Sequence, residues 1–124
     1  MNTRTIKDSS LENFDALLAK HNITYNRGWG WVGNGWHPLL DEMFTKLTAL
    51  GWDREMTQVK EKFGQLRVYI GEATNEMWQV VHEAERKSAK VCEECGQPGR
   101  PTGGGWVRTA CTTCVPDDEP PQAA

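Results

Sequence analysis

The stretch MTQVKEKFGQLRVYIG, residues 56–71, decides the fold of this chain. Apolar and polar side chains alternate before and after Gly64-Gln65, a pattern typical of two antiparallel strands joined by a tight turn. A glycine in the first position of a two-residue loop favours a type II′ turn. The stretch therefore predicts a β-hairpin over about 56–71 that turns at Gly64 and Gln65.

This turn also sets which residues lie opposite each other in the hairpin. The expected opposed pairs are Phe63–Leu66, Lys62–Arg67, Glu61–Val68 and Lys60–Tyr69. One face is then apolar, with Glu61 as its exception, and carries Val59, Phe63, Leu66, Val68 and Ile70. The other face is cationic and carries Lys60, Lys62, Arg67 and Tyr69.

The cationic face is the strongest candidate for a binding site. Like charges directly opposite each other, as expected for Lys62 and Arg67, destabilise a sheet by a few tenths to about 1 kcal/mol. A bound phosphate would neutralise them, because the guanidinium donates two parallel hydrogen bonds and lysines such as Lys60 act as point charges. The Tyr69 hydroxyl would donate a further hydrogen bond. The alternative is a solvated, lysine-rich face that keeps a sheet edge from aggregating.

Three helices are expected around the hairpin. A capping box and an apolar stripe predict a helix over 9–20. A second helix begins at Pro38, runs to about residue 50 and ends at Gly51. A third spans about 74–89. Residues 22–37, which interleave glycine and tryptophan, predict a loop between the first two helices.

That glycine–tryptophan loop is the second candidate site. Its three indoles, Trp29, Trp31 and Trp36, could form a stacking platform for a base, or they could fill the core of a small protein. The loop also contains Gly-x-Gly-x-x-Gly at 28–33. No strand–turn–helix pattern surrounds this match to the dinucleotide fingerprint, so we interpret it as chance.

Four cysteines in two Cys-x-x-Cys pairs predict one structural zinc site near the C-terminus. The expected ligands are Cys92, Cys95, Cys111 and Cys114. Four thiolates complete a tetrahedral shell and leave no open position for water or substrate. The alternatives are two disulfides or a redox dithiol. The N-terminus lacks the apolar segment of a signal peptide, so we expect a cytoplasmic protein whose thiols stay reduced.

Composition sets the remaining boundaries. The net charge of −3 and the pI near 5.6 argue mildly against a nucleic-acid module. No stretch approaches the roughly 18 apolar residues of a membrane span. We expect an α+β fold: a helical and hairpin domain over 1–90, a zinc ribbon over 91–115, and a disordered acidic tail over 116–124.

Catalysis finds no support in the sequence. His82 and Glu85 are expected to form an ordinary pair on a helix surface, and His21 has no identifiable partner. All four cysteines are assigned to zinc, so no thiol is left as a nucleophile. The sequence also lacks the His-x-Glu and Pro-Cys-x-x-Cys segments of zinc deaminases. We therefore expect a non-enzymatic protein.

Several of these runs, in order, resemble one family of small bacteriophage and bacterial proteins. The runs are Gly35-Trp36-His37-Pro38-Leu39, Gln58-Val59-Lys60-Glu61-Lys62-Phe63-Gly64, Leu66-Arg67-Val68-Tyr69, Cys92-Glu93-Glu94-Cys95-Gly96-Gln97-Pro98-Gly99 and Gly104-Gly105-Trp106. The resemblance covers about residues 28–114. It implies a setting in phages and their hosts, but no mechanism. Because its motif includes the cations of the hairpin, it favours a binding site over a solvated face.

The leading hypothesis from the sequence is a zinc-containing phage-type protein that acts in the bacterial cytoplasm. It would hold a compact phosphate-bearing ligand, such as a nucleotide signal of host immunity, between the hairpin and the tryptophans, and so counter host defence. One alternative is a nucleic-acid-binding zinc ribbon that uses Arg100, Trp106 and Arg108. The other is an adaptor that inhibits a host enzyme through the ribbon.

Overall fold

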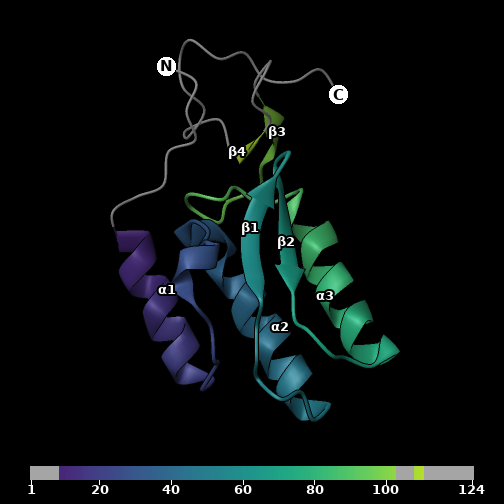
Figure 1. Cartoon of the computed structure of the whole chain (residues 1–124). Helices are drawn as coiled ribbons and strands as arrows, with labels where there is room; N and C mark the ends of the chain where they lie inside the picture. The colour runs from purple at the N-terminus through teal and green to yellow at the C-terminus, as the bar shows by residue number, and fades with distance from the viewer. Residues whose placement is uncertain (1–8, 103–107, 111–124) are drawn as a thin grey trace.

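The computed structural model describes residues 9–102 and 108–110, where three helices surround an antiparallel hairpin (Figure 1). The elements in chain order are α1 (Ser9–Lys20), η1 (Arg27–Trp29), η2 (Asn34–Trp36), α2 (His37–Ala49), β1 (Gln58–Lys62), β2 (Gln65–Tyr69), α3 (Asn75–Ser88), β3 (Arg100–Thr102) and β4 (Arg108–Ala110). The α+β class is confirmed. Each predicted helix agrees with the observed bounds to within one residue at either end.

Local signals set the ends of the helices. Pro38 occupies the first turn of α2, where its missing N–H leaves no hydrogen bond unmade. Gly51 follows that helix with a φ of +89°, a left-handed conformation that glycine adopts without strain. Thr74 caps α3, because its side chain accepts a hydrogen bond from the Met77 N–H at 3.2 Å.

The hairpin turns one residue earlier than predicted. Phe63 and Gly64 occupy the turn with φ values of +53° and +79°, the two positive values that a type I′ turn requires. The predicted turn at Gly64 and Gln65 is therefore wrong, and the pairing shifts by two residues along β1. Because side chains alternate with a period of two, this shift leaves each residue of the strands on its predicted face.

The core lies between the inner face of the hairpin and the helices. Figure 1 shows α2 behind the hairpin, with α1 on one side and α3 on the other. The largest fully buried side chains are Trp36, Phe14, Phe44, Leu40, Met43, Leu47, Leu66, Ile70, Val32, Val59, Val68 and Val81. Phe63, which we expected in this core, is instead 75% exposed because it belongs to the turn.

Helix α3 closes the free edge of β2 with side chains. The Leu66 N–H donates to Ser88 Oγ at 2.8 Å, and the Val68 N–H donates to Glu85 Oε2 at 3.0 Å. The other oxygen of Glu85 lies 3.1 Å from His82 Nδ1. The His82–Glu85 pair forms as expected, but Glu85 is only 8% exposed and holds the strand. An open edge that could pair with another chain is thus satisfied within the fold.

A second small sheet, β3–β4, lies near the hairpin turn (Figure 1). The Thr109 hydroxyl of β4 donates a hydrogen bond to the Gly64 carbonyl in that turn. The Glu93 N–H donates to the Thr109 carbonyl at 3.2 Å. Strand β4 therefore joins the hairpin turn to the segment that contains the first cysteine pair. The predicted acidic tail over 116–124 lies outside the described residues.

Candidate anion-binding surface and cysteine turn

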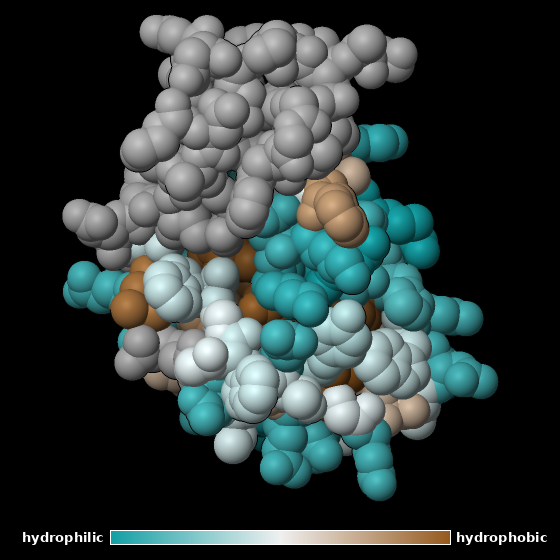
Figure 2. Space-filling view, turned by 45° about the horizontal axis from the view of Figure 1, so that its top comes forward, coloured by the Kyte–Doolittle hydropathy of each residue, from teal (hydrophilic) through white to brown (hydrophobic). Residues whose placement is uncertain are grey.

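The outer face of the hairpin gathers three cations. Lys60 lies directly opposite Arg67, and Lys62 lies opposite Gln65. The predicted pairing of Lys62 with Arg67 is wrong because the turn comes earlier, yet two like charges still face each other. Figure 2 shows a band of hydrophilic side chains on this side of the molecule. The opposed cations destabilise the hairpin unless a counter-charge is bound.

Two of these cations lie over aromatic rings. Lys60 Nζ is 5.8 Å from the centroid of the Tyr69 ring, and Lys62 Nζ is 5.8 Å from the centroid of the Phe63 ring. A cation at this distance is attracted by the quadrupole of the ring. Tyr69 is 42% exposed, as a binding residue must be. Phe63 therefore joins the surface that the sequence predicted from Lys60, Lys62, Arg67 and Tyr69.

Glu61, the exception on the apolar face, has a local role in the turn. Its carboxylate accepts a hydrogen bond from the Gly64 N–H at 2.7 Å. The contact ties the end of β1 to the turn residue that follows Phe63. The carboxylate therefore helps to hold Phe63 in the exposed position that it occupies.

The glycine–tryptophan loop lies against the outer edge of β1. The Tyr25 hydroxyl donates to the Gly30 carbonyl at 2.7 Å and accepts from the Val59 N–H at 3.1 Å. Burial raises the pKa of the Tyr25 phenol above its ordinary value, so the hydroxyl stays protonated at neutral pH. Gly30 has a φ of +113°, and a Cβ there would stand 2.4 Å from the Val59 carbonyl oxygen. Only glycine fits this approach.

The three tryptophans of the loop differ in how far they are exposed to solvent. Trp29 is 59% exposed and Trp31 is 37% exposed, so both remain available to a ligand. The Trp31 indole N–H donates to Ser10 Oγ of α1 at 3.1 Å. Trp36 is fully buried, and its indole N–H donates to the Val91 carbonyl at 2.8 Å. For Trp36 the core interpretation holds, and its burial removes it from the candidate ligand-binding residues.

Cys92 and Cys95 lie on one tight turn. The Cys92 N–H donates to the Gln97 carbonyl at 2.8 Å, and the Gly96 N–H donates to the Cys92 carbonyl at 2.9 Å. Gly96 has a φ of +82°, which closes the turn. Cys92 is buried and Cys95 is exposed, and the turn places the first pair of a Cys-x-x-Cys segment within one chain reversal.

The second cysteine pair, Cys111 and Cys114, lies outside the described residues. Within the part of the chain that the structure describes, no group of three or more His, Cys, Asp or Glu side chains could hold a metal ion. Trp106, which the nucleic-acid-binding alternative uses, also lies outside the described residues.

Two glycines of the loop pack directly against the cysteine turn. The Gly33 N–H donates to Glu93 Oε2 at 3.0 Å, and the Gly35 N–H donates to the Glu93 carbonyl at 2.6 Å. A Cβ on Gly35 would stand 2.0 Å from the Cys92 carbonyl oxygen. These glycines therefore allow the backbone of the loop to approach the backbone of the cysteine turn closely. Sequence reasoning missed this contact because it joins segments about sixty residues apart.

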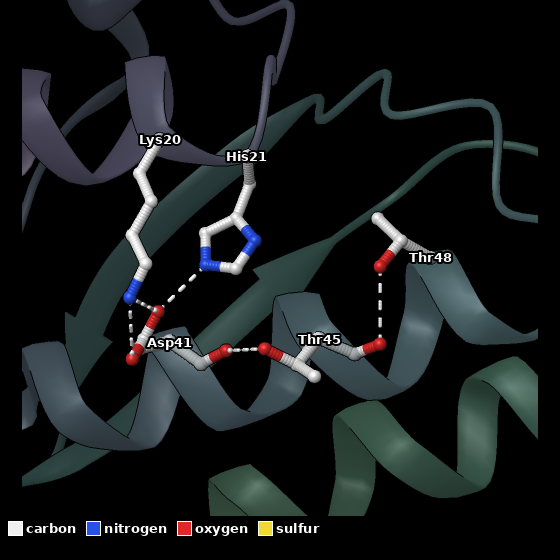
Figure 3. A network of polar contacts seen from close by, with 5 residues as sticks. All are labelled: Lys20, His21, Asp41, Thr45 and Thr48. Atoms are coloured by element: carbon white, nitrogen blue, oxygen red, sulfur yellow. Dashed lines mark hydrogen bonds and ion pairs between the residues drawn. The ribbon is translucent and has the colours of Figure 1, made fainter.

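A separate polar cluster joins the end of α1 to α2 (Figure 3). His21 Nε2 lies 2.6 Å from Asp41 Oδ1, and Lys20 Nζ lies 3.0 Å from the same oxygen. The expectation that His21 has no partner is therefore wrong. These hydrogen bonds, from His21 first and Lys20 second, hold the pKa of Asp41 below its ordinary value. Thr45 and Thr48 donate to carbonyls of α2 beside it.

Comparisons with known proteins found no match to this chain. No family model matches the chain, and neither a curated protein nor a solved structure matches it. Among the described helices, none is long and apolar enough to cross a bilayer. The function must therefore be inferred from the geometry of the surface.

Proposed function

We propose that the protein is a non-enzymatic binding protein whose outer hairpin face holds a phosphate-bearing, nucleotide-type ligand. The observation that carries this proposal is the opposed pair of Lys60 and Arg67 beside the exposed ring of Tyr69. A phosphate between the two cations removes their repulsion. The guanidinium grips it with two hydrogen bonds, and the ammonium adds a point charge.

The exposed aromatic residues supply the second half of the recognition. Trp29 and Trp31 are exposed on the loop that Tyr25 ties to the edge of β1, next to the hairpin that carries the cations. A base stacked on one aromatic side chain gains about 1–3 kcal/mol. Cations together with exposed rings favour a ligand with a phosphate and a planar base over a simple inorganic anion.

The resemblance to phage and bacterial proteins suggests the setting. In the cytoplasm of a bacterial host, a protein that sequesters a nucleotide signal of immunity lowers the free concentration of that signal. Such capture counters host defence without any chemical step. The amount of protein, rather than a turnover rate, then limits the effect.

We also propose that the four cysteines hold one structural zinc ion. The ligands would be Cys92, Cys95, Cys111 and Cys114. The tight turn of the first pair fits this role, and the Glu93–Thr109 hydrogen bond holds β4 against that turn. Ala110, the last residue of β4, directly precedes Cys111 in the sequence. Four thiolates close the zinc shell, so the ion stabilises the fold and takes no part in chemistry.

Titration calorimetry with linear, cyclic and ADP-ribose-type nucleotides tests the ligand proposal. We expect Lys60→Glu and Arg67→Glu each to weaken binding by about tenfold or more, because each removes a charge-assisted contact. Lys90→Glu makes the same charge change at an exposed position outside the hairpin and serves as the control. Absence of heat with every nucleotide, or equal effects of all three variants, would refute the proposal.

Native mass spectrometry tests the zinc proposal separately. We expect one zinc ion per chain, and loss of that ion in Cys92→Ser. A metal-free chain whose mass shows two disulfides would contradict it. Because zinc is read from the mass and ligand binding from the calorimetry, failure of one proposal leaves the other standing.

A further inference from the structure

Exposed aromatic rings lie at both ends of the outer hairpin face. Among the described residues, the exposed large hydrophobic side chains are Trp29, Trp31, Leu50, Phe63 and Tyr69. All except Leu50 belong to the hairpin or to the loop beside it. Phe63 lies in the turn, and Tyr69 is the last residue of β2. The loop with the tryptophans contacts β1 at Val59, near the Tyr69 end.

The distance between these ends exceeds what a ligand with one base can use. Strand β2 runs from Gln65 to Tyr69, and four steps of roughly 3.3 Å give a length of about 13 Å. Phe63 lies beyond Gln65. A stacked nucleic-acid strand rises about 3.4 Å per nucleotide, so the face corresponds to about four nucleotides.

Each of the two lysines on this face lies over one of the two rings. Lys60 lies over the ring of Tyr69 and Lys62 lies over the ring of Phe63, with the same separation of 5.8 Å. The two lysines are two residues apart on β1, which corresponds to about 6.6 Å. Each unit offers a ring for a base and an ammonium for a phosphate. Two rings at separate ends of one face, each beside a cation, fit a ligand that has at least two bases.

Phe63 adds an observation that stability alone does not explain. Its φ of +53° is unfavourable for an L-residue with a bulky side chain, and asparagine or glycine suits this turn position better. The ring is 75% exposed, so its burial contributes little to the free energy of folding. A strained and exposed aromatic residue at a turn is characteristic of a binding role.

We propose that the ligand of this face is a single-stranded oligonucleotide, contacted over about four nucleotides. Its bases stack on Tyr69 at one end and Phe63 at the other, and its phosphates lie on Lys60, Lys62 and Arg67. The inference rests on the proposed function and narrows the ligand from a nucleotide to a strand. The strand is either a free short oligonucleotide or a single-stranded part of a longer nucleic acid.

Fluorescence anisotropy with labelled thymidylates of one, two, four and eight nucleotides tests this inference on the full-length protein. We expect affinity to rise at least about tenfold from one to four nucleotides, because a second base stacks, and to change little from four to eight. Three neutralised phosphates predict a slope of log K against log salt of about −2. Four further probes identify the source of the strand by their relative affinities. They are oligouridylates of matching length, a cyclic oligonucleotide, a long single strand and a duplex of equal length.

Phe63 supplies the decisive variants. Phe63→Ala should weaken binding of the four-nucleotide probe by about tenfold and leave the mononucleotide unaffected. Phe63→Asn should do the same while raising the midpoint of thermal unfolding, since asparagine suits the turn. Leu50→Ala removes an exposed apolar side chain at the end of α2 and is the matched control.

The outcomes separate the inference from the proposed function. Three results would overturn the oligonucleotide proposal and leave the nucleotide proposal standing. They are equal affinity for one and four nucleotides, unchanged affinity of Phe63→Ala for the four-nucleotide probe, and a duplex bound as tightly as the single strand. Failure of every probe, together with absence of heat with every nucleotide in the calorimetry, would overturn both.

Discussion

Replacing Gly35 by alanine tests whether the glycine–tryptophan loop packs on the cysteine turn as described. The added Cβ would stand 2.0 Å from the Cys92 carbonyl oxygen, 2.4 Å from the Gly96 nitrogen and 2.7 Å from the Glu93 carbonyl oxygen. All three are backbone atoms and cannot rotate away. Overpacking costs about 1–3 kcal/mol, and the lost hydrogen bond to Glu93 costs about 1 kcal/mol. We expect the free energy of unfolding to fall by about 3 kcal/mol.

Gly51→Ala is the matched control for this experiment. Gly51 has a φ of +89°, but nothing lies within 4 Å of its would-be Cβ. Its substitution should therefore cost only conformational strain, about 1 kcal/mol. Urea unfolding with linear extrapolation measures both variants. A Gly35→Ala protein within about 0.5 kcal/mol of wild type, or less affected than Gly51→Ala, would refute the described packing.

Three further substitutions test other contacts of the fold. Ser88→Ala leaves the Leu66 N–H without its acceptor and should cost about 1–3 kcal/mol in urea unfolding, so an unchanged midpoint would contradict the edge closure. Asp41→Asn tests a pH dependence. Because hydrogen bonds such as that from His21 lower the pKa of Asp41, its stabilisation is present above the ordinary carboxyl pKa and is lost as the pH falls through the lowered value. The variant should lose about 1 kcal/mol at neutral pH and little in strong acid, and an equal loss at both would argue against this linkage. Tyr25→Phe removes the hydroxyl that ties the loop to β1, which should cost about 1–2 kcal/mol, and wild-type stability would contradict that role.

The helices were predictable because their signals are local. Pro38, Gly51 and Thr74 each act within one turn of chain, so a single sequence reveals them. The hairpin turn was not predictable in the same way, because Phe63 takes a left-handed conformation that its residue type disfavours. The faces of the strands were nonetheless predicted correctly, since the resulting shift of two residues preserves the alternation.

The candidate site was predictable only where the pattern along one hairpin determines it. Lys60 and Arg67 share the outer face because of strand alternation, whichever turn forms. Contacts between distant segments left no such pattern. The approach of Gly35 to the cysteine turn, and the contact of His21 with Asp41, depend on how whole elements pack.

The two edges of the hairpin are closed by side chains rather than by neighbouring strands. On one edge the Val59 N–H donates a hydrogen bond to Tyr25. On the other edge the N–H groups of Leu66 and Val68 donate hydrogen bonds to side chains of α3. A hairpin alone is marginally stable in water, so these strands gain their amide partners only when the loop and helix dock. Amide hydrogen exchange at these positions therefore requires the cooperative opening of several elements. The proposed ligand face thus lies on strands that open together with the elements around them.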